Sequence, residues 1–371
     1  MRIGILTQPI HTNYGGILQA FALQTILTRL GHEVYIINRD NRTWLWLFLH
    51  RCIRFFFDLT GRDYVCPMNG ELVILQRNQS KFINKELHLT KRVNTSNALR
   101  QLCTELNLEG YVVGSDQVWR PKYSPNIGNY FLDFTTGENV KRVAYAASLG
   151  TDNWSFTKSE TIKCKNLAQK FNGISVREES AVRLCRDNLE VNAQHVLDPT
   201  MLLEAVDYAK FCTESQKVDG DLFAYFLDDN SQKRKLLLQI SNKTQMKPFF
   251  CMPSQKATTR NLKLSPADCV FPSIDQWINS FLNAKMVVTD SFHGCVFSII
   301  FNKPFWVCGN QSRGNARFDS LLSLFGLQNR LIDCDGAQHI DIKTPVDWKF
   351  VNERIIQLRA MSLKFLIDSL K

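Results

Sequence analysis

The chain has 371 residues, of which 44% are hydrophobic and 22% are charged. That composition excludes a disordered, collagen-like or small disulfide-stapled protein, and the length predicts about two domains. Lysine and arginine (45) exceed aspartate and glutamate (35) by ten, but the excess is spread along the chain. It therefore fits an anionic small ligand or an anionic membrane surface as well as a nucleic acid.

The first 40 residues follow a strand–helix–strand pattern. Arg2–Thr7 is a short apolar run that predicts a strand, and the loop Asn13–Gly16 follows it. Ile17–Leu30 has apolar residues at helical spacing and stops at Gly31, and Glu33–Asn38 predicts a second strand. Two strands joined by a helix in this way predict a parallel sheet.

The segment Arg42–Asp58 is too apolar for an ordinary connection. On a helical wheel His50, Arg51, Arg54 and Asp58 share one narrow arc, and aromatic and aliphatic residues cover most of the rest. This pattern is typical of a helix that lies in a membrane interface. A helix that packs against its own domain or forms a dimer contact fits it equally.

The alternation of strands and helices continues to the C-terminus. Further strands are predicted at Tyr111–Val113, Val143–Ala147, Ile174–Val176, Leu222–Leu227, Pro248–Met252, Met286–Thr289 and Pro304–Val307. Helices are predicted at Gln232–Ser241, Ile274–Asn283 and Gly294–Phe301. We therefore expect an α/β fold with two Rossmann-like parallel-sheet domains facing a cleft. The expected domains are residues 1–205 and 206–345, with a hinge near 200–215, and a helix at 346–371 is expected to pack back across both.

Polar residues follow four of the predicted strands, where a parallel sheet presents its carboxyl ends to ligands. The strongest of these signals is Thr289–Gly294, which leads from a strand into a helix. His293 would lie in the first helical turn, where it can exchange a proton with a bound anion. Alternatively Asp290 or Ser291 caps the helix and His293 is merely exposed.

Arg177 is at the end of another strand, a natural place for a guanidinium to bind carboxylate or phosphate. Glu178 or Glu179 could instead hold it in a structural ion pair. After the strand at 111–113, Ser115, Asp116, Gln117 and Trp119 offer groups that suit sugar hydroxyls and ring faces. Gly15 and Gly16 would let the backbone approach a ligand closely. All four strand ends are expected to converge on one cleft.

Several well-known motifs are absent from the sequence. It has no Gly-x-Gly-x-x-Gly, no P-loop, no Gly-x-Ser-x-Gly and no Cys-x-x-Cys. Dinucleotide, P-loop, hydrolase and zinc sites therefore have no support. The cysteines are odd in number, which predicts free thiols in a reducing compartment, and no apolar run reaches the 18 residues or so of a membrane span. We expect a cytoplasmic protein.

At the four strand ends described above, the sequence resembles the polysaccharide pyruvyl transferase family. The matching segments, in order along nearly the whole chain, are Asn13–Leu23, Val113–Trp119, Ser175–Ser180, Asp198–Thr200 and Thr289–Gly294. The resemblance implies a two-domain glycosyltransferase-B-type fold and the transfer of pyruvate from phosphoenolpyruvate to sugar hydroxyls, usually as a cyclic ketal. The implied acceptor is a sugar of a bacterial surface polysaccharide or of its lipid-linked precursor.

The resemblance and the chemistry together assign roles to residues. His293 would be the catalytic acid, Asp116 would act as base on the acceptor side, and Arg177 would bind the donor's anionic groups. Further donor-binding residues are expected to be Ser291, Gly294, Arg313 and Arg317. Acceptor-binding residues are expected to be Asn13, Tyr14, Gly15, Gly16, Ser115, Gln117 and Trp119. One departure is that the family often has arginine two residues before the histidine, where this chain has Ser291, so Arg177, Arg313 or Arg317 would have to compensate.

Phosphoenolpyruvate would be a co-substrate, with no metal or other cofactor and no nucleic acid. The competing enzyme interpretation is a nucleotide-sugar-dependent glycosyltransferase of the same fold, although no residues mark a pocket for base and ribose. A non-catalytic sugar- or nucleic-acid-binding protein would leave the histidine, arginine and aspartate at strand ends unexplained. If residues 42–58 do bind lipid, the protein would be peripheral at the inner face of the cell membrane. Arg42, Arg51 and Arg54 would then face anionic head groups.

Overall fold

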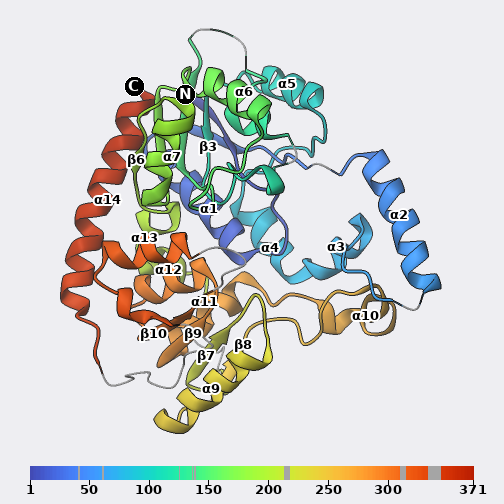
Figure 1. Ribbon diagram of the computed structural model, residues 1–371, viewed down its shortest axis with the longest axis vertical. Coiled ribbons are helices and arrows are strands. Elements are labelled where there is room, and N and C mark those ends of the chain that lie inside the picture. The colour runs from blue at the N-terminus through green and yellow to red at the C-terminus, as the bar shows by residue number, and fades with distance from the viewer. Residues whose placement is uncertain are drawn as a thin grey trace.

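The structure is a computed structural model that describes the chain apart from residues 41, 61, 125, 136, 138, 213–217, 310–314 and 333–343. Its strands form two sheets with helices packed around them (Figure 1). The strand order is β2-β1-β3-β4-β5-β6 in the first sheet and β11-β10-β9-β7-β8 in the second. Every strand pair in the described residues is parallel. The prediction of two parallel sheets in an α/β fold is confirmed.

The first sheet is built from the N-terminal half of the chain. Its strands are β1 (Arg2–Leu6), β2 (Glu33–Ile36), β3 (Gly110–Val113), β4 (Lys141–Ala147), β5 (Gly173–Val176) and β6 (Gln194–His195). The α-helices of this half are α1 (Tyr14–Arg29), α2 (Trp44–Leu59), α3 (Asn69–Leu75), α4 (Arg77–Glu86), α5 (Ser96–Glu105), α6 (Lys158–Ala168), α7 (Glu179–Leu189) and α8 (Ala205–Ala209). Short 3₁₀ helices are η1 (Pro121–Tyr123), η2 (Ile127–Phe131) and η3 (Pro199–Leu202).

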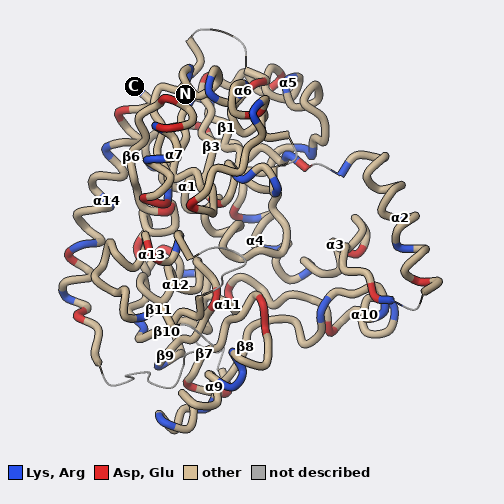
Figure 2. The backbone as a smooth tube through the Cα atoms, viewed as in Figure 1, with Lys and Arg blue, Asp and Glu red and all other residues tan. Residues whose placement is uncertain are grey.

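The second sheet follows α8 in the chain. Its strands are β7 (Leu222–Tyr225), β8 (Pro248–Phe250), β9 (Met286–Thr289), β10 (Phe305–Cys308) and β11 (Leu331–Ile332). The helices are α9 (Ser231–Thr244), α10 (Thr259–Leu264), α11 (Ile274–Asn283), α12 (Phe292–Ile300), α13 (Ala316–Leu324) and α14 (Trp348–Leu370), with 3₁₀ helices η4 (Pro266–Cys269) and η5 (Gln328–Arg330). Charged residues of both signs are distributed over both sheets' domains (Figure 2).

One apolar core runs through both domains. The side chains of α1 are almost all buried, and they share a cluster with residues of α11 and α12 from the second domain. Tyr14 stacks on Trp277 with ring centroids 5.3 Å apart, and it packs edge-on against Tyr225 at 6.2 Å. Because aromatic rings interlock across the boundary, the two sheets are fixed relative to each other.

The C-terminal helix α14 contacts both domains. It packs on β4 and η3 of the first domain, and Arg359 donates hydrogen bonds to the carbonyls of Met201 and Leu203. Near its other end, Arg354 Nε donates to the carbonyl of Leu324 in α13. The helix therefore links the two domains along one side of the molecule (Figure 1).

The predicted helix at 42–58 is present as α2, but none of its sixteen residues is buried. The segment therefore does not complete the core of the N-terminal domain, which was one of the alternatives left open by the sequence. Among the described residues, no helix has the combination of length and hydropathy that crossing a bilayer requires. The two-residue strands β6 and β11 were not predicted, because so short a segment has no measurable periodicity.

Candidate active site

The carboxyl ends of the two sheets meet at one cluster of charged side chains. The loops after β3, β5 and β6 contribute Asp116, Arg177 and Asp198 from the first domain. The turn between β9 and α12 contributes His293 from the second domain, within 3.6 Å of Asp198. Parallel strands present loops and helix N-termini at this edge, so side chains distant in sequence converge there.

Asp198 is a fully buried carboxylate that the other groups of the site share. Its Oδ2 accepts hydrogen bonds from Arg177 Nη1 at 3.0 Å and from Ser115 Oγ at 2.9 Å. Its Oδ1 accepts from the backbone N–H and the hydroxyl of Thr200. Burial alone would raise the pKa of Asp198, but the contact with His293 and the charge of Arg177 hold that pKa well below its usual range. Asp198 is therefore a fixed negative charge beside the imidazole.

His293 lies in the first turn of α12, directly after β9. Ser291 caps the helix, since its Oγ accepts a hydrogen bond from the Gly294 N–H at 3.3 Å. The capping interaction is thus present, yet only 8% of the His293 side chain is exposed, so the histidine is not merely a surface residue. Its Nε2 faces Asp198 at 3.6 Å and makes no hydrogen bond within the described part of the chain. That nitrogen is a buried polar atom without a hydrogen-bond partner among the described residues.

The other edge of the imidazole lies against the start of α1, which explains the need for glycine there. We expect Gly15→Ala to displace the imidazole and to lower turnover by about 10²-fold, because small misplacements of a reacting group are costly. A Cβ at Gly15 would lie 2.0 Å from His293 Nδ1, whereas a Cβ at Gly16 would lie 3.3 Å from Asn13 Nδ2.

Gly16→Ala is the matched control, since both glycines are in the first turn of α1 and alanine is the better helix former. Turnover and thermal unfolding of the two variants check the expectation. Equal loss of activity in both would show that the imidazole does not depend on the space above Gly15.

Arg177 is surrounded by three carboxylates. Its guanidinium pairs with Asp198 at 3.0 Å and lies 3.7 Å from both Asp116 and Glu178. Its Cζ lies 4.3 Å from the ring centroid of Phe292, a cation–π contact. The structural ion pair considered as an alternative is therefore present, with Glu178 and also with Asp198. Nε and Nη2 nevertheless make no hydrogen bond to any described residue, so donors remain for an anion.

A second guanidinium, that of Arg317, comes from the first turn of α13. Burial lowers the pKa of Arg317 to about 10, and the positive charge of Arg177 acts in the same direction. Its Nε has no hydrogen-bond partner in the structure as described. Arg317 thus adds a second buried cation to a cluster in which Arg177 is already paired with carboxylates. Arg313, the other expected donor ligand, lies outside the described residues.

The residues expected on the acceptor side divide into two groups. Ser115 and Asp116 belong to the charged cluster: the Ser115 hydroxyl is bonded to Asp198, and Asp116 Oδ1 accepts from the Gln117 N–H at 2.9 Å. The Gln117 side chain accepts a hydrogen bond from Arg120 Nη1 at 2.8 Å. Arg120, which the sequence did not single out, thus lies beside this group.

The second group is occupied with packing. Tyr14 is buried between the domains and donates its hydroxyl to the carbonyl of Pro272 at 2.8 Å. Trp119 is fully buried, stacks on Phe131, and donates Nε1 to the carbonyl of Tyr130. Asn13 is exposed at the N-cap of α1 and Gly16 is in its first turn. The structure does not bring the Trp119 ring to the charged cluster.

Two further buried carboxylates belong to the site: Asp198, to which the sequence assigned no role, and Glu178, which it considered only as an ion-pair partner of Arg177. Asp198 was visible only as part of an Asp-Pro-Thr turn, because the strand before it is too short to detect. Glu178 accepts a hydrogen bond from the Ser148 hydroxyl and adds negative charge beside Arg177. Asp290, considered as a helix cap, instead pairs with Lys233 at 2.5 Å.

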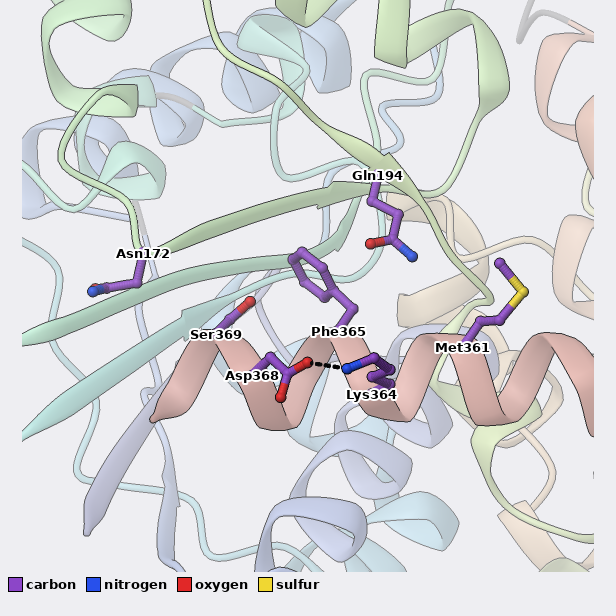
Figure 3. A pocket seen from close by; sticks show the side chains of 7 residues that line it. All are labelled: Asn172, Gln194, Met361, Lys364, Phe365, Asp368 and Ser369. Carbon is purple, nitrogen blue, oxygen red and sulfur yellow. Dashed lines mark hydrogen bonds and ion pairs between the residues drawn. The ribbon is translucent and has the colours of Figure 1, made fainter.

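The described residues outside the charged cluster form no metal-binding group, although they do line a pocket. Among the described residues, no group of three or more histidine, cysteine, aspartate or glutamate side chains could hold a metal ion. A pocket of about 450 Å³ lies at the amino ends of β5 and β6, at the opposite edge of the sheet from the charged cluster (Figure 3). It is lined by Asn172, Gln194, Met361, Lys364, Phe365, Asp368 and Ser369.

Solved structures resemble this chain in fold. UDP-GlcNAc 2-epimerase from Methanocaldococcus jannaschii, in complex with UDP-GlcNAc and UDP, is 12% identical with a TM-score of 0.48 and covers 97% of this chain and 100% of its own. MurG from Acinetobacter baumannii is 9% identical with a TM-score of 0.41, over 99% of this chain and 94% of its own. Arabidopsis thaliana UGT89C1 with UDP-L-rhamnose is 10% identical with a TM-score of 0.50, over 98% of each chain. The fold is glycosyltransferase-B-like, as predicted.

In sequence, residues 13–312 match the family described as polysaccharide pyruvyl transferase. No curated protein sequence is significantly similar to the chain. The family match covers all the segments that form the charged cluster except Arg317 and the rest of α13.

Proposed function

The chain belongs to the polysaccharide pyruvyl transferase family, and from this premise we propose that it transfers pyruvate from phosphoenolpyruvate to two hydroxyls of a sugar, forming a pyruvate ketal. The observation that carries the proposal is the buried cluster of His293, Arg177 and Arg317 at the meeting of the two sheets. It combines a proton-exchanging group with two cations, which is what a reactive enol phosphate requires.

The donor has a carboxylate and a phosphate, and the cluster offers a partner for each. Among the described residues, Nε and Nη2 of Arg177 and Nε of Arg317 have no hydrogen-bond partner. Both side chains are buried, so an anion would exchange water for charge-assisted hydrogen bonds in a region of low dielectric. Arg317 takes the place of the arginine that the family often has at position 291, where this chain has serine.

The first chemical step needs an acid. The π electrons of the donor's double bond take a proton from His293, and the methylene carbon becomes a methyl group. The adjacent carbon becomes oxocarbenium-like, and the oxygen of a sugar hydroxyl bonds to it while losing its proton to a base. Asp198 is placed to orient the ring, because its carboxylate is fixed 3.6 Å from His293 Nε2.

The second step closes the ketal. A second sugar hydroxyl bonds to the same carbon and gives its proton to the neutral imidazole left on His293, while phosphate leaves with the electron pair of its C–O bond, so no oxidant or reductant is required. Asp116 is the proposed base on the acceptor side, since its carboxylate is the partly exposed one of the three around Arg177. Neutralisation of the leaving phosphate by Arg177 and Arg317 favours this step.

We expect Arg317→Gln to raise the KM for phosphoenolpyruvate by about 10- to 100-fold, the usual range for losing one charge-assisted hydrogen bond in a buried site. The KM for the acceptor should change little. Arg234→Gln is the control, because Arg234 is an exposed arginine of the same domain that pairs with Asp229. An unchanged donor KM in the Arg317 variant would remove that residue from the donor site.

The reaction itself is tested by incubating the purified protein with phosphoenolpyruvate and candidate acceptor saccharides. We expect release of inorganic phosphate that depends on the acceptor, with a mass increase of the saccharide that corresponds to a pyruvate ketal. Consumption of a UDP-sugar with release of UDP, and no use of phosphoenolpyruvate, would instead identify a nucleotide-sugar-dependent glycosyltransferase.

The described cysteines are all free thiols, which supports a reducing, cytoplasmic location.

A further inference from the structure

Helix α2 exposes most of its large apolar side chains to solvent, and its half-buried side carries both polar residues (His50, Arg54) and apolar ones (Trp46, Leu47, Phe57). Most surface helices instead turn their apolar stripe toward the core. The exposed large apolar side chains, with the fraction of each that is exposed, are Trp44 (77%), Leu45 (52%), Phe48 (56%), Leu49 (51%), Ile53 (39%), Phe55 (61%), Phe56 (65%) and Leu59 (67%). We call these eight residues the apolar face of α2.

Specific polar contacts fix the opposite side of α2 in this orientation. Arg54 pairs with Glu71 at 2.7 Å, and Asp58 pairs with Lys263 of α10 at 2.9 Å. His50 lies against the Tyr64 hydroxyl. Because three consecutive turns of the helix are tied inward by polar groups, the apolar face points outward as part of the folded structure. Figure 1 shows α2 at the periphery of the molecule, away from both sheets.

We propose that the apolar face of α2 binds the surface of a lipid bilayer that contains anionic phospholipids. Tryptophan and three phenylalanines on one side of a peripheral helix are the composition that enters the interfacial layer of a membrane. The exposed cations Arg51 and Arg62, at the edge and the C-terminal end of the helix, complement phosphate head groups.

A second copy of the chain is the competing occupant of this face. A stable dimer needs a complementary protein surface of about 800 Å² on each partner. A bilayer has no such requirement, because it can accept an isolated convex helix of sixteen residues.

The structure also corrects the cationic contacts expected from the sequence. Arg42 is buried and lies 3.5 Å from Asp40, and Arg54 is paired with Glu71, so neither faces outward with Arg51. The interaction therefore depends on insertion of apolar side chains more than on charge, and salt should weaken it only modestly.

The base of α2 adjoins the loop that precedes α1. Arg42, two residues before α2, has its Nη2 2.7 Å from His11 Nε2. Lipid binding would thus bring the loop before Asn13 close to the membrane. If the proposed function is correct, a lipid-linked acceptor would be presented on this side, but lipid binding does not depend on that reaction.

The test is co-sedimentation of the full chain with vesicles of equimolar phosphatidylglycerol and phosphatidylcholine. The face variant is Trp44→Ser/Phe48→Ser/Phe55→Ser. The matched control is Ile162→Ser/Val206→Ser/Ile356→Ser, which removes three side chains of similar exposure (64%, 66% and 64%) away from α2. We expect the wild type and the control to bind, and the face variant to lose at least about tenfold in partition constant. Raising the salt concentration should weaken wild-type binding by less than the three serine substitutions of the face variant do.

Each alternative outcome overturns the proposal. If the wild type stays in the supernatant, or the face variant binds as well as the control, α2 is not a lipid-binding surface. Sedimentation velocity without lipid identifies a second copy: a wild-type dimer that the face variant makes monomeric, with no vesicle binding, would assign the face to self-association. Thermal unfolding shows that the face variant is folded, and the phosphoenolpyruvate assay, run without lipid on a free saccharide, tests the proposed function separately.

Discussion

Replacing His293 by glutamine is expected to lower turnover by about 10²- to 10⁴-fold, the range that general acid catalysis supplies. Glutamine fills a similar volume and keeps an N–H near Asp198, but it cannot deliver a proton at neutral pH. The donor KM should change little, because Arg177 and Arg317 remain in place. The rate of phosphate release from phosphoenolpyruvate at saturating acceptor measures the effect.

A control from the same helix separates catalysis from packing. Cys295→Ala changes a fully buried side chain of α12 two residues away and should lower stability while leaving most of the turnover. If His293→Gln retains a near wild-type rate on the true acceptor, the imidazole is not the acid. If it loses rate and also unfolds at a much lower temperature, the loss is structural.

The second large effect is expected for Asp198→Asn, in stability as well as activity. Removing the carboxylate leaves the buried Arg177 without its closest counter-charge, and breaking such a pair usually costs about 3–5 kcal/mol of unfolding free energy. The amide also puts a donor opposite donors, since Arg177 and Ser115 both donate to Oδ2. Turnover should also fall, because the imidazole of His293 loses the carboxylate that orients it.

The difference in unfolding free energy between the wild type and Asp198→Asn should depend on pH. The pKa of Asp198 is lower in the folded chain than in the unfolded chain, so its ionised form contributes stability at neutral pH that is lost as the pH falls. The difference between wild type and Asp198→Asn should therefore be largest at neutral pH and shrink on acidification below about pH 4. Denaturant unfolding at several pH values measures it.

Asp368→Asn is the matched carboxylate control. Asp368 pairs with Lys364 and Lys371 at the exposed end of α14, where solvent screens the interaction, so little change in stability is expected. A similar loss in both variants would mean that the burial of the Asp198 pair is unimportant, contrary to the structure.

Local sequence patterns were enough to predict the parallel α/β fold and the strand ends from which the site is built. Apolar runs such as Met286–Thr289 and Tyr111–Val113 are short, uniformly buried strands, and helix Ile274–Asn283 has the bounds that its periodicity predicts. These elements are local, so a periodicity of two or 3.6 residues is enough to find them. The motif around His293 was readable for the same reason, because it joins a strand to a helix within six residues.

Only the tertiary structure decided which groups act together and which way surfaces face. Asp198 follows the edge strand β6 of the first sheet and lies between Arg177 and His293, which belongs to α12 beside the second sheet. No local sequence pattern encodes this contact. The space that Gly15 leaves for the imidazole is likewise a contact between domains. For α2, the helical wheel predicted the two faces, but which of them faces solvent depends on distant partners such as Lys263. Periodicity reports the relation between neighbours in the chain, whereas charge pairing and burial depend on side chains hundreds of residues away.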